Sequence, residues 1–142
     1  MKKTILGKYT LQTPLPEHAK QQAELQAIVF PTLSEEELIT EEKYKRHLEI
    51  FPEGQFIVLD GDRVIASCTT LRQNYHKGHH TFLQISDDLW LGTHDPKADW
   101  IYGLDVSVHP DYQGKGIGRE IYNARQEVAK TLGCKGQMTA GM

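Results

Sequence analysis

Positions 104–119 read Leu104-Asp105-Val106-Ser107-Val108-His109-Pro110-Asp111-Tyr112-Gln113-Gly114-Lys115-Gly116-Ile117-Gly118-Arg119. The first part belongs to an apolar stretch that predicts a strand over 100–108, and Pro110 ends it because proline cannot continue a sheet ladder. A helix is predicted over 116–132, because apolar residues recur on one helical face at Ile117, Ile121, Ala124, Val128 and Leu132. The segment therefore predicts a strand, a glycine-rich loop and an amphipathic helix in direct succession.

The glycines of this loop predict an anion site. The first turn of a helix presents backbone N–H groups that lack intrahelical partners, at the positive end of the helix dipole. Gly114, Gly116 and Gly118 carry no side chain that would block an anion, and Lys115 and Arg119 add positive charge. The spacing fits neither a P-loop nor the G-x-G-x-x-G of a dinucleotide-binding fold. The segment predicts a phosphate or pyrophosphate cradle of another class, and the alternative is a strand-to-helix connection without a ligand.

The run from Gln113 to Gly118 matches the [Gln/Arg]-x-x-Gly-x-[Gly/Ala] signature of the GNAT superfamily of N-acetyltransferases. The segment 106–110 before it resembles the fourth strand of that family and its exit. This resemblance implies an α/β fold of the α+β type, in which helices flank a mixed, mainly antiparallel central sheet. It implies acetyl-CoA as co-substrate, without a metal.

The same resemblance implies where coenzyme A binds. In the family, the fourth strand carries a bulge and splays from the fifth, and the pantetheine arm inserts between them. On this chain, the backbone of Val106, Ser107 and Val108 is then expected to pair with the pantetheine. Six residues are expected to line the pyrophosphate, namely Gln113, Gly114, Lys115, Gly116, Ile117 and Gly118.

The implied reaction is direct transfer of an acetyl group to a primary amine of a small molecule or peptide. Because a free lysine-type amine has a pKa of about 10.4, a base must remove its proton before attack. We predict Asp105 as this base, since the even positions 102–108 form an apolar strand face and Asp105 lies on the smaller, more polar face. The alternative for Asp105 is a structural hydrogen bond, and Tyr102 is the second candidate for the base. A backbone N–H near Val106 is expected to stabilise the negative charge on the thioester oxygen.

The remaining segments predict a coarse element order. We expect a strand over 8–13, a helix over 17–30, a helix opened by Ser34 that runs to about 51, and a hairpin of strands 55–59 and 63–71. The region 72–97 is irregular, with a helical turn near 87–91, and a last strand is expected over 135–140. Residues 1–142 are thus predicted to form one GNAT-like domain, truncated after the fifth strand of the family. Its open sheet edge predicts homodimerisation or strand exchange.

Composition limits the other function classes. The 142 residues carry 16 basic and 19 acidic side chains for a net charge of −3, without a basic block that would favour nucleic acid. No apolar run approaches the ~20 residues of a membrane span, and the N-terminus does not resemble a signal peptide. Cys68 and Cys134 are expected to be reduced, buried thiols, and a cytoplasmic location is predicted.

Two further function classes stay open. The first is a non-catalytic acyl-CoA-binding module, in agreement with the early end of the domain. The second is a metal site at the histidines of the irregular region, His76, His79, His80 and His94. These histidines lack a cysteine or carboxylate partner at a recognised spacing, which favours a solvated loop.

Overall fold

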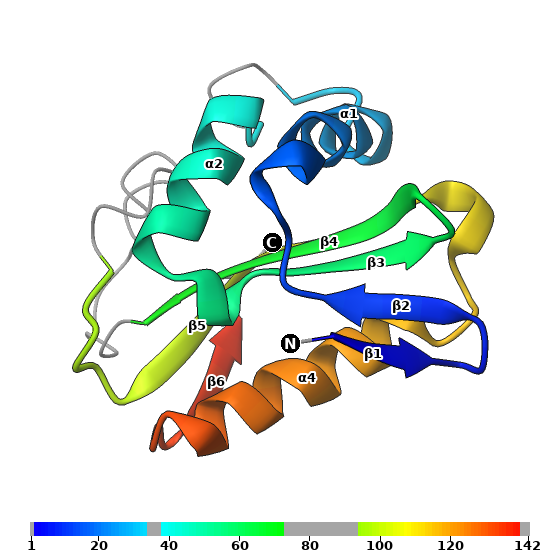
Figure 1. Cartoon of the computed structure of the whole chain (residues 1–142). Coiled ribbons are helices and arrows are strands. Elements are labelled where there is room, and N and C mark those ends of the chain that lie inside the picture. The colour runs from blue at the N-terminus through cyan, green and yellow to red at the C-terminus, as the bar shows by residue number, and fades with distance from the viewer. Residues whose placement is uncertain (1, 34–37, 73–93, 140–142) are drawn as a thin grey trace.

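The computed structural model describes residues 2–33, 38–72 and 94–139 (Figure 1). Its centre is a six-stranded sheet in which the strand order follows the chain. The strands are β1 (Lys2–Ile5), β2 (Tyr9–Gln12), β3 (Phe56–Asp60), β4 (Arg63–Arg72), β5 (Trp100–Val108) and β6 (Gly136–Thr139). Neighbouring strands run antiparallel except for β5 and β6, which are parallel. This mixed, mainly antiparallel sheet with helices on both sides confirms the predicted fold class.

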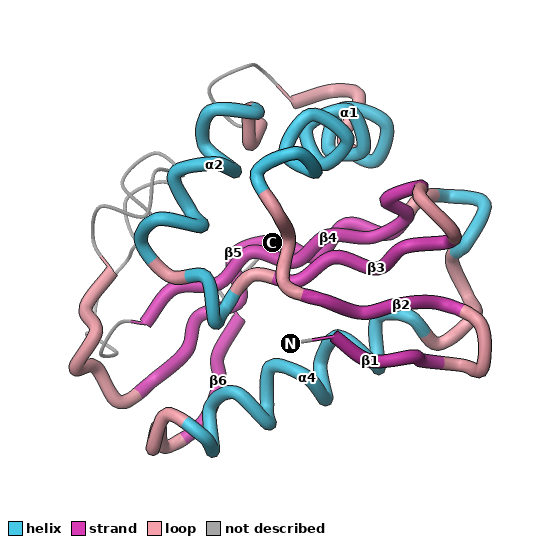
Figure 2. Tube along the Cα trace, in the orientation of Figure 1, coloured by secondary structure: helices cyan, strands magenta, loops and turns pink. Residues whose placement is uncertain are grey.

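Three α-helices and three short 3-10 helices complete the described part of the chain (Figure 2). The helices α1 (Ala19–Val29) and α2 (Glu41–Ile50) lie together on one face of the sheet, and α4 (Ile117–Thr131) lies on the opposite face (Figure 1). The 3-10 helices are Pro16–His18, Pro52–Gly54 and Pro110–Tyr112. In the described ranges, no helix has the length and apolarity that crossing a bilayer demands.

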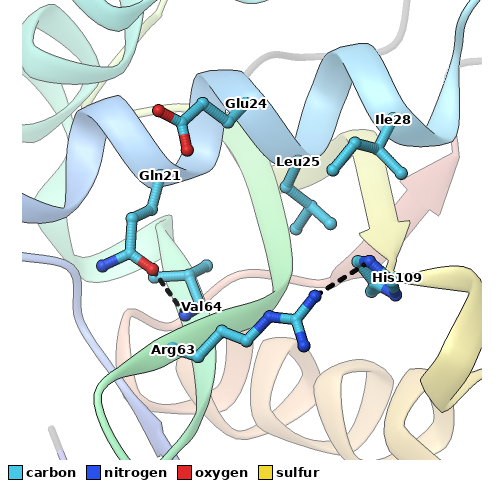
Figure 3. Close-up of a pocket in the computed structure, with 7 residues that line it drawn as sticks. All are labelled: Gln21, Glu24, Leu25, Ile28, Arg63, Val64 and His109. Carbon is cyan, nitrogen blue, oxygen red and sulfur yellow. Dashed lines mark hydrogen bonds between the residues drawn. The ribbon is translucent and has the colours of Figure 1, made fainter.

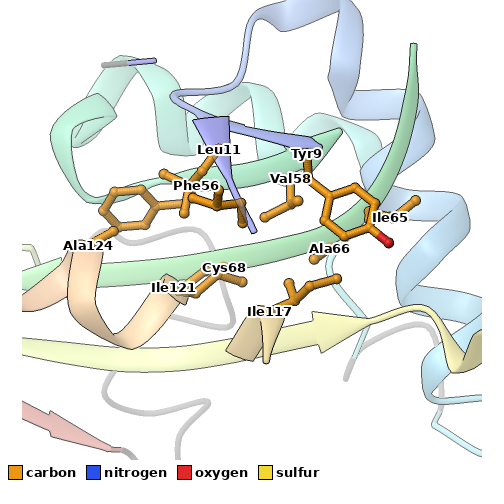
Figure 4. Packing of buried hydrophobic residues seen from close by; sticks show 11 residues of the cluster. Tyr9, Leu11, Phe56, Val58, Ile65, Ala66, Cys68, Ile117, Ile121 and Ala124 are labelled. Atoms are coloured by element: carbon orange, nitrogen blue, oxygen red, sulfur yellow. The ribbon is translucent and has the colours of Figure 1, made fainter. Parts of the chain in front are cut away.

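The largest apolar cluster lies between α4 and the sheet (Figure 4). From α4 it receives Ile117, Ile121 and Ala124, which confirms the helix face predicted from their spacing. The sheet contributes side chains from four consecutive strands, namely Ile5, Tyr9, Leu11, Phe56, Val58, Ile65, Ala66 and Cys68. This packing fixes the direction of α4 beneath the sheet and therefore the position of the helix N-terminus.

The N-terminal hairpin was predicted only in part. The expected strand over 8–13 is β2, but β1 precedes it and pairs with it through a turn at Leu6 and Gly7. Both residues have positive φ values, 52° and 73°, and the N–H of Lys8 donates to the carbonyl of Ile5 at 3.1 Å, so residues 5–8 form a tight turn with two left-handed central residues. The side chains of this hairpin reach the glycine loop, because Tyr9 contacts the ring of Tyr112 edge-on at 5.9 Å.

The second helix starts later than predicted. Helix α2 begins at Glu41, and the hydroxyl of Thr40 accepts a hydrogen bond from the backbone N–H of Lys43 at 3.4 Å. The predicted start at Ser34 is outside the described residues, while residues 38–40 are not helical. Thr40 followed by two glutamates is as good a helix opening as Ser34, and the fold uses the later one.

Strand β5 contains a bulge, as the resemblance implies. Thr69 of β4 pairs with Asp105 and Thr70 pairs with Gly103, so Leu104 is the extra residue. The bulge reverses the alternation of side chains, and the predicted division into even and odd faces is therefore wrong beyond it. Tyr102 packs with Leu71 on the α1 and α2 face, and Asp105 points to that same face.

Candidate functional site

The N-terminus of α4 carries no side-chain cap. Its N-cap residue is Gly116, which has a left-handed backbone with φ of 89°, and Gly114 is also left-handed with φ of 77°. The backbone N–H of Glu120 donates to the carbonyl of Gly116 at 3.2 Å, so the N–H groups of residues 117–119 precede the first hydrogen bond of the helix. A Cβ atom added at Gly114 or Gly118 would meet no other atom within 4 Å. These N–H groups are therefore open to an approaching anion.

Side chains around the loop tie it to the sheet. The amide of Gln113 donates to the carbonyl of Val108 at 3.0 Å, across the 3-10 turn. The hydroxyl of Tyr112 donates to the carboxylate of Asp60 at the end of β3 at 2.6 Å. Gln113 thus holds the loop conformation, while the exposed Lys115 supplies charge at its tip.

Within the part of the chain that the structure describes, β6 pairs with only the first half of the adjacent edge of β5. The parallel pairing with β6 covers residues 100–103 and ends where Gly103 pairs with Thr139. Beyond this rung, none of the described residues pairs with that edge of β5. The side chain of Val106 is 38% exposed there. Val106, Ser107 and Val108 therefore lie between the bulge and the loop that leads into α4.

A buried polar cluster surrounds Asp105 on the α1 and α2 face. The amide nitrogen of Gln26 lies 3.4 Å from Oδ1 of Asp105 and 3.4 Å from the hydroxyl of Ser107. The Ser107 hydroxyl donates to Oδ2 of Asp105 at 2.9 Å. The hydroxyl of Tyr44 donates to the amide oxygen of Gln26 at 3.3 Å, which directs the Gln26 amide nitrogen towards the carboxyl group.

Burial changes the acid–base properties of this cluster. Asp105 is 6% exposed, and loss of hydration raises its pKa to about 7, although the hydrogen bond from Ser107 opposes this rise. Burial also holds the pKa of Tyr44 well above its ordinary value, so this hydroxyl stays protonated. The carboxyl of Asp105 can therefore gain or lose a proton near neutral pH.

Tyr102 lies on the same face but in an apolar setting. It is 5% exposed and packs with Leu71, Leu104 and Ile50. The structure brings Tyr102 and Asp105 to one face of β5 and places the glycine loop at the end of that strand.

Gln26 and Tyr44 were not predicted as site residues. The sequence did hold one indication, because Gln22 and Gln26 are four residues apart in a predicted helix and so share a helical face. Both are buried, and the amide of Gln22 donates to the hydroxyl of Ser67 at 2.9 Å. Tyr44 reaches the cluster from another helix, a tertiary contact that no local pattern encodes.

The histidine region contributes little that the structure describes. His76, His79 and His80 are outside the described residues. The Nδ1 atom of His94 accepts a hydrogen bond from the backbone N–H of Arg72 at 2.9 Å, and its ring stacks on Phe51. No group of three potential metal ligands occurs within residues 2–33, 38–72 and 94–139. Of the two cysteines, Cys68 is buried as expected, whereas Cys134 is only half-buried, and neither forms a disulfide.

A separate pocket lies between α1 and the start of β4 (Figure 3). Three of its polar side chains already have partners, because Arg63 lies 3.1 Å from Nε2 of His109 and the Gln21 side chain accepts from the N–H of Val64 at 3.0 Å. The lining residues are Gln21, Glu24, Leu25, Ile28, Arg63, Val64 and His109. None of the predicted site residues lines it.

Comparison with known sequences gives one family and two bacterial relatives. The acetyltransferase (GNAT) family matches over residues 22–140. The probable hydrolase YhcX of Bacillus subtilis is 38% identical over 97 residues, which cover 67% of this chain and 19% of that protein. The uncharacterized N-acetyltransferase YkwB of the same organism is 33% identical over 107 residues, which cover 73% of this chain and 47% of that protein. The matched segment is thus about a fifth of the length of YhcX and about half of the length of YkwB.

Solved structures share the fold at low sequence identity. The loading GNATL domain of CurA from Lyngbya majuscula superposes with a TM-score of 0.69 at 21% identity, over 84% of this chain and 57% of that one. The GphF GNAT-like decarboxylase in complex with isobutyryl-CoA gives 0.67 at 16% identity, over 83% and 57% of the two chains. AAC(6')-Iy, in complex with the bisubstrate analog CoA-S-monomethyl-acetylneamine, gives 0.61 at 13% identity, over 92% and 78%. Because the family match covers most of the sequence and these structures share its fold, the chain belongs to the acetyltransferase (GNAT) family.

Proposed function

We propose that this chain transfers an acetyl group from acetyl-CoA to a primary amine of a small molecule or peptide, by direct attack of the amine. The observation that carries the proposal is a buried carboxyl group with a pKa of about 7, Asp105, beside the bulge of β5. The same strand has an open edge that leads to an uncapped helix N-terminus. Family membership supports an acyl-CoA donor, and the relative YkwB is named as an N-acetyltransferase.

The residues of the loop and of the strand edge fit coenzyme A. In this proposal, residues 113–118 hold the pyrophosphate through backbone N–H groups, and Lys115 adds a positive charge. The backbone of Val106, Ser107 and Val108 hydrogen-bonds the pantetheine arm along the open edge of β5. Bound acetyl-CoA supplies the thioester that the amine attacks.

Asp105 removes the proton that the amine must lose. A carboxylate with a pKa of about 7 is more basic than an ordinary aspartate, and it is still largely ionised just above neutral pH. A backbone N–H near Val106 donates to the thioester oxygen as negative charge develops there. Tyr102, on the same face of β5, is the second candidate for proton transfer. Activity is then expected to rise with pH through about 7, as Asp105 ionises.

A non-catalytic acyl-CoA-binding module is the second candidate function. One observation favours it, because both oxygens of the Asp105 carboxyl group already accept hydrogen bonds from Gln26 and Ser107. A carboxyl group held in this way also serves a purely structural role. The relative YhcX is named a probable hydrolase, but the match to this chain covers only 19% of YhcX, so that name does not decide between the two candidates.

Thermal unfolding with ligand tests the donor. Acetyl-CoA at 100 times its dissociation constant is expected to add about 2.7 kcal/mol to the free energy of unfolding. For a domain of this size, that is a rise of roughly 8–12 °C in melting temperature. NAD and ATP serve as controls and are expected to give no such rise. An equal shift with ATP, or no shift with acetyl-CoA, would contradict the proposed site.

Thiol release then separates the two candidate functions. A panel of primary amines is incubated with acetyl-CoA, and free coenzyme A is measured with a thiol reagent. Turnover with an amine supports the transferase. Binding of acetyl-CoA without turnover across the panel would favour the non-catalytic module.

Gln26→Leu is expected to move the pH profile of the reaction upwards. The Gln26 amide donates to the carboxylate of Asp105 and so favours its ionised form. Without this donor, the pKa of Asp105 rises, and the midpoint of kcat against pH should increase by on the order of one unit. Glu24→Gln, an exposed change on the same helix, is the control and should leave the midpoint in place. An unchanged or lower midpoint in Gln26→Leu would exclude Gln26 as a positioning residue for Asp105.

A further inference from the structure

Arg125 is a buried cation on the third turn of α4. Its side chain is 7% exposed, and its guanidinium lies against the backbone of β5 at Gly103. A Cβ atom at position 103 would collide with Nη1 of Arg125 and would lie 3.0 Å from its Cζ. Only glycine allows this approach in the middle of a strand, where glycine is otherwise unfavourable.

Two neutral side chains of the described residues, Cys68 and Tyr122, lie beside the Arg125 guanidinium. Its Nη1 atom lies 4.0 Å from the sulfur of Cys68, and burial raises the pKa of that thiol to about 12. Its Cζ atom lies 5.7 Å from the centre of the Tyr122 ring. The ion pairs formed within the described residues do not include Arg125, and its buried Nε atom has no hydrogen-bond partner there. A buried charge without a counter-charge is costly, so this site favours an anion.

The position of Arg125 relates this anion to the proposed cofactor. Gly103 and Thr139 form the last rung of the β5–β6 pair, and the open edge of β5 begins directly after it. The proposed pantetheine path runs along that edge from Val108 towards this rung. Arg125 is eight residues after Ile117, which places it about 12 Å along the helix axis from the proposed pyrophosphate site. The guanidinium therefore lies near the acyl end of the path, where the pyrophosphate does not reach.

We infer that Arg125 closes the base of an acyl pocket and binds the carboxylate of a short dicarboxylic acyl group, of the malonyl class. This inference rests on the proposed coenzyme A site and adds a second donor class to acetyl-CoA. A charge-assisted hydrogen bond from arginine to a carboxylate favours such a donor over an uncharged one of the same shape. Asp105 does not supply the counter-charge, because its carboxyl group faces α1 on the other side of the sheet.

Calorimetric titration of the whole chain tests this pocket. The ligands are coenzyme A, malonyl-CoA and isovaleryl-CoA, the last two having acyl groups of nearly equal shape but different charge. The wild-type chain is expected to bind malonyl-CoA at least ~10-fold more tightly than isovaleryl-CoA. Arg125→Gln should bring the ratio of the dissociation constants of isovaleryl-CoA and malonyl-CoA close to one. Lys130→Gln removes an exposed charge from the same helix and should keep the wild-type ratio.

The outcomes separate this inference from the proposed function. If coenzyme A itself does not bind, the proposed site fails and the acyl pocket fails with it. If coenzyme A binds but the wild-type ratio is close to one, or Arg125→Gln keeps the preference, only the Arg125 pocket is wrong. Where circular dichroism shows that Arg125→Gln does not fold, Gly103→Ala replaces it, because the added methyl group displaces the guanidinium and keeps its charge. The ratio should fall towards one in that variant as well.

Discussion

Asp105→Asn is expected to lower kcat by about 10²–10⁴-fold, the usual contribution of a general base. Asparagine has nearly the shape of aspartate. Its amide oxygen can accept from Gln26 in place of Oδ1, and its NH2 group, in place of Oδ2, can donate to the hydroxyl of Ser107. It cannot take a proton from the amine. The loss should therefore appear in kcat, measured as release of coenzyme A, while the dissociation constant of acetyl-CoA changes little. A variant that retains wild-type kcat would assign the base to another group, with Tyr102→Phe as the next variant.

The same substitution should stabilise the protein at alkaline pH. Burial raises the pKa of Asp105 from 3.8 to about 7, so the folded chain binds this proton more tightly than the unfolded chain. The tighter binding of this proton adds to the free energy of unfolding. This contribution is fully present below about pH 4 and is lost as pH rises through about 7. A shift of this size corresponds to a few kcal/mol at most, and asparagine avoids the loss because it stays neutral.

Melting temperatures across pH measure this effect. The Asp105→Asn variant and the wild-type chain should melt at similar temperatures near pH 4, and the variant should melt higher at pH 8. Asp111→Asn, an exposed change after the same strand, is the matched control. A variant that is less stable than wild type at pH 8 would mean that the buried carboxylate has a stabilising partner in its ionised form.

Gly118→Leu is expected to weaken acetyl-CoA binding at least ~100-fold, which is about 2.7 kcal/mol. Gly118 is in the first turn of α4, and a Cβ atom there meets open space in the free protein. A leucine at this position therefore fits the fold, and it favours helix more than glycine does. It would nevertheless project from the helix end where the pyrophosphate is proposed to contact the backbone.

This position separates loss of the ligand site from loss of the fold. At Gly116, whose φ is 89°, any other residue would be strained whether or not a ligand binds there. The unfolding free energy of Gly118→Leu without ligand should not decrease, and its melting shift with acetyl-CoA should vanish. Asn123→Ala tests helix propensity alone on the same helix and should keep the melting shift. An unchanged dissociation constant in Gly118→Leu would place the pyrophosphate elsewhere.

Local patterns in the sequence predicted the elements that present the site. The bounds of β5 agree with the predicted strand 100–108, because its apolar run is continuous and Pro110 ends it. Helix α4 agrees to within one residue at each end with the predicted 116–132, since its apolar face is regular and Gly116 precedes it. The glycine loop could be located for the same reason, because its conformation depends on residues that are neighbours in the chain.

The rest of the site depends on contacts between distant segments. Nothing in 100–108 shows that Leu104 is the extra residue of a bulge, because that follows from its pairing with β4. The face of Asp105 therefore could not be predicted from alternation. The cluster around Asp105 joins two helices to a strand, because Gln26 is 79 residues before Asp105 and Tyr44 is 61 residues before it, and only tertiary packing brings them together.

The N-terminal hairpin has a consequence for the proposed coenzyme A site. Its turn residue Leu6 lies 3.8 Å from the position of a Cβ on Gly116, and Tyr9 packs against Tyr112, so the hairpin supports the loop from below. Substitutions within the first ten residues would thus alter the backbone geometry at the helix end without touching any group that meets the ligand. If coenzyme A binds as proposed, the sequence of this hairpin is therefore a place where its affinity can be changed while strand β5 stays the same.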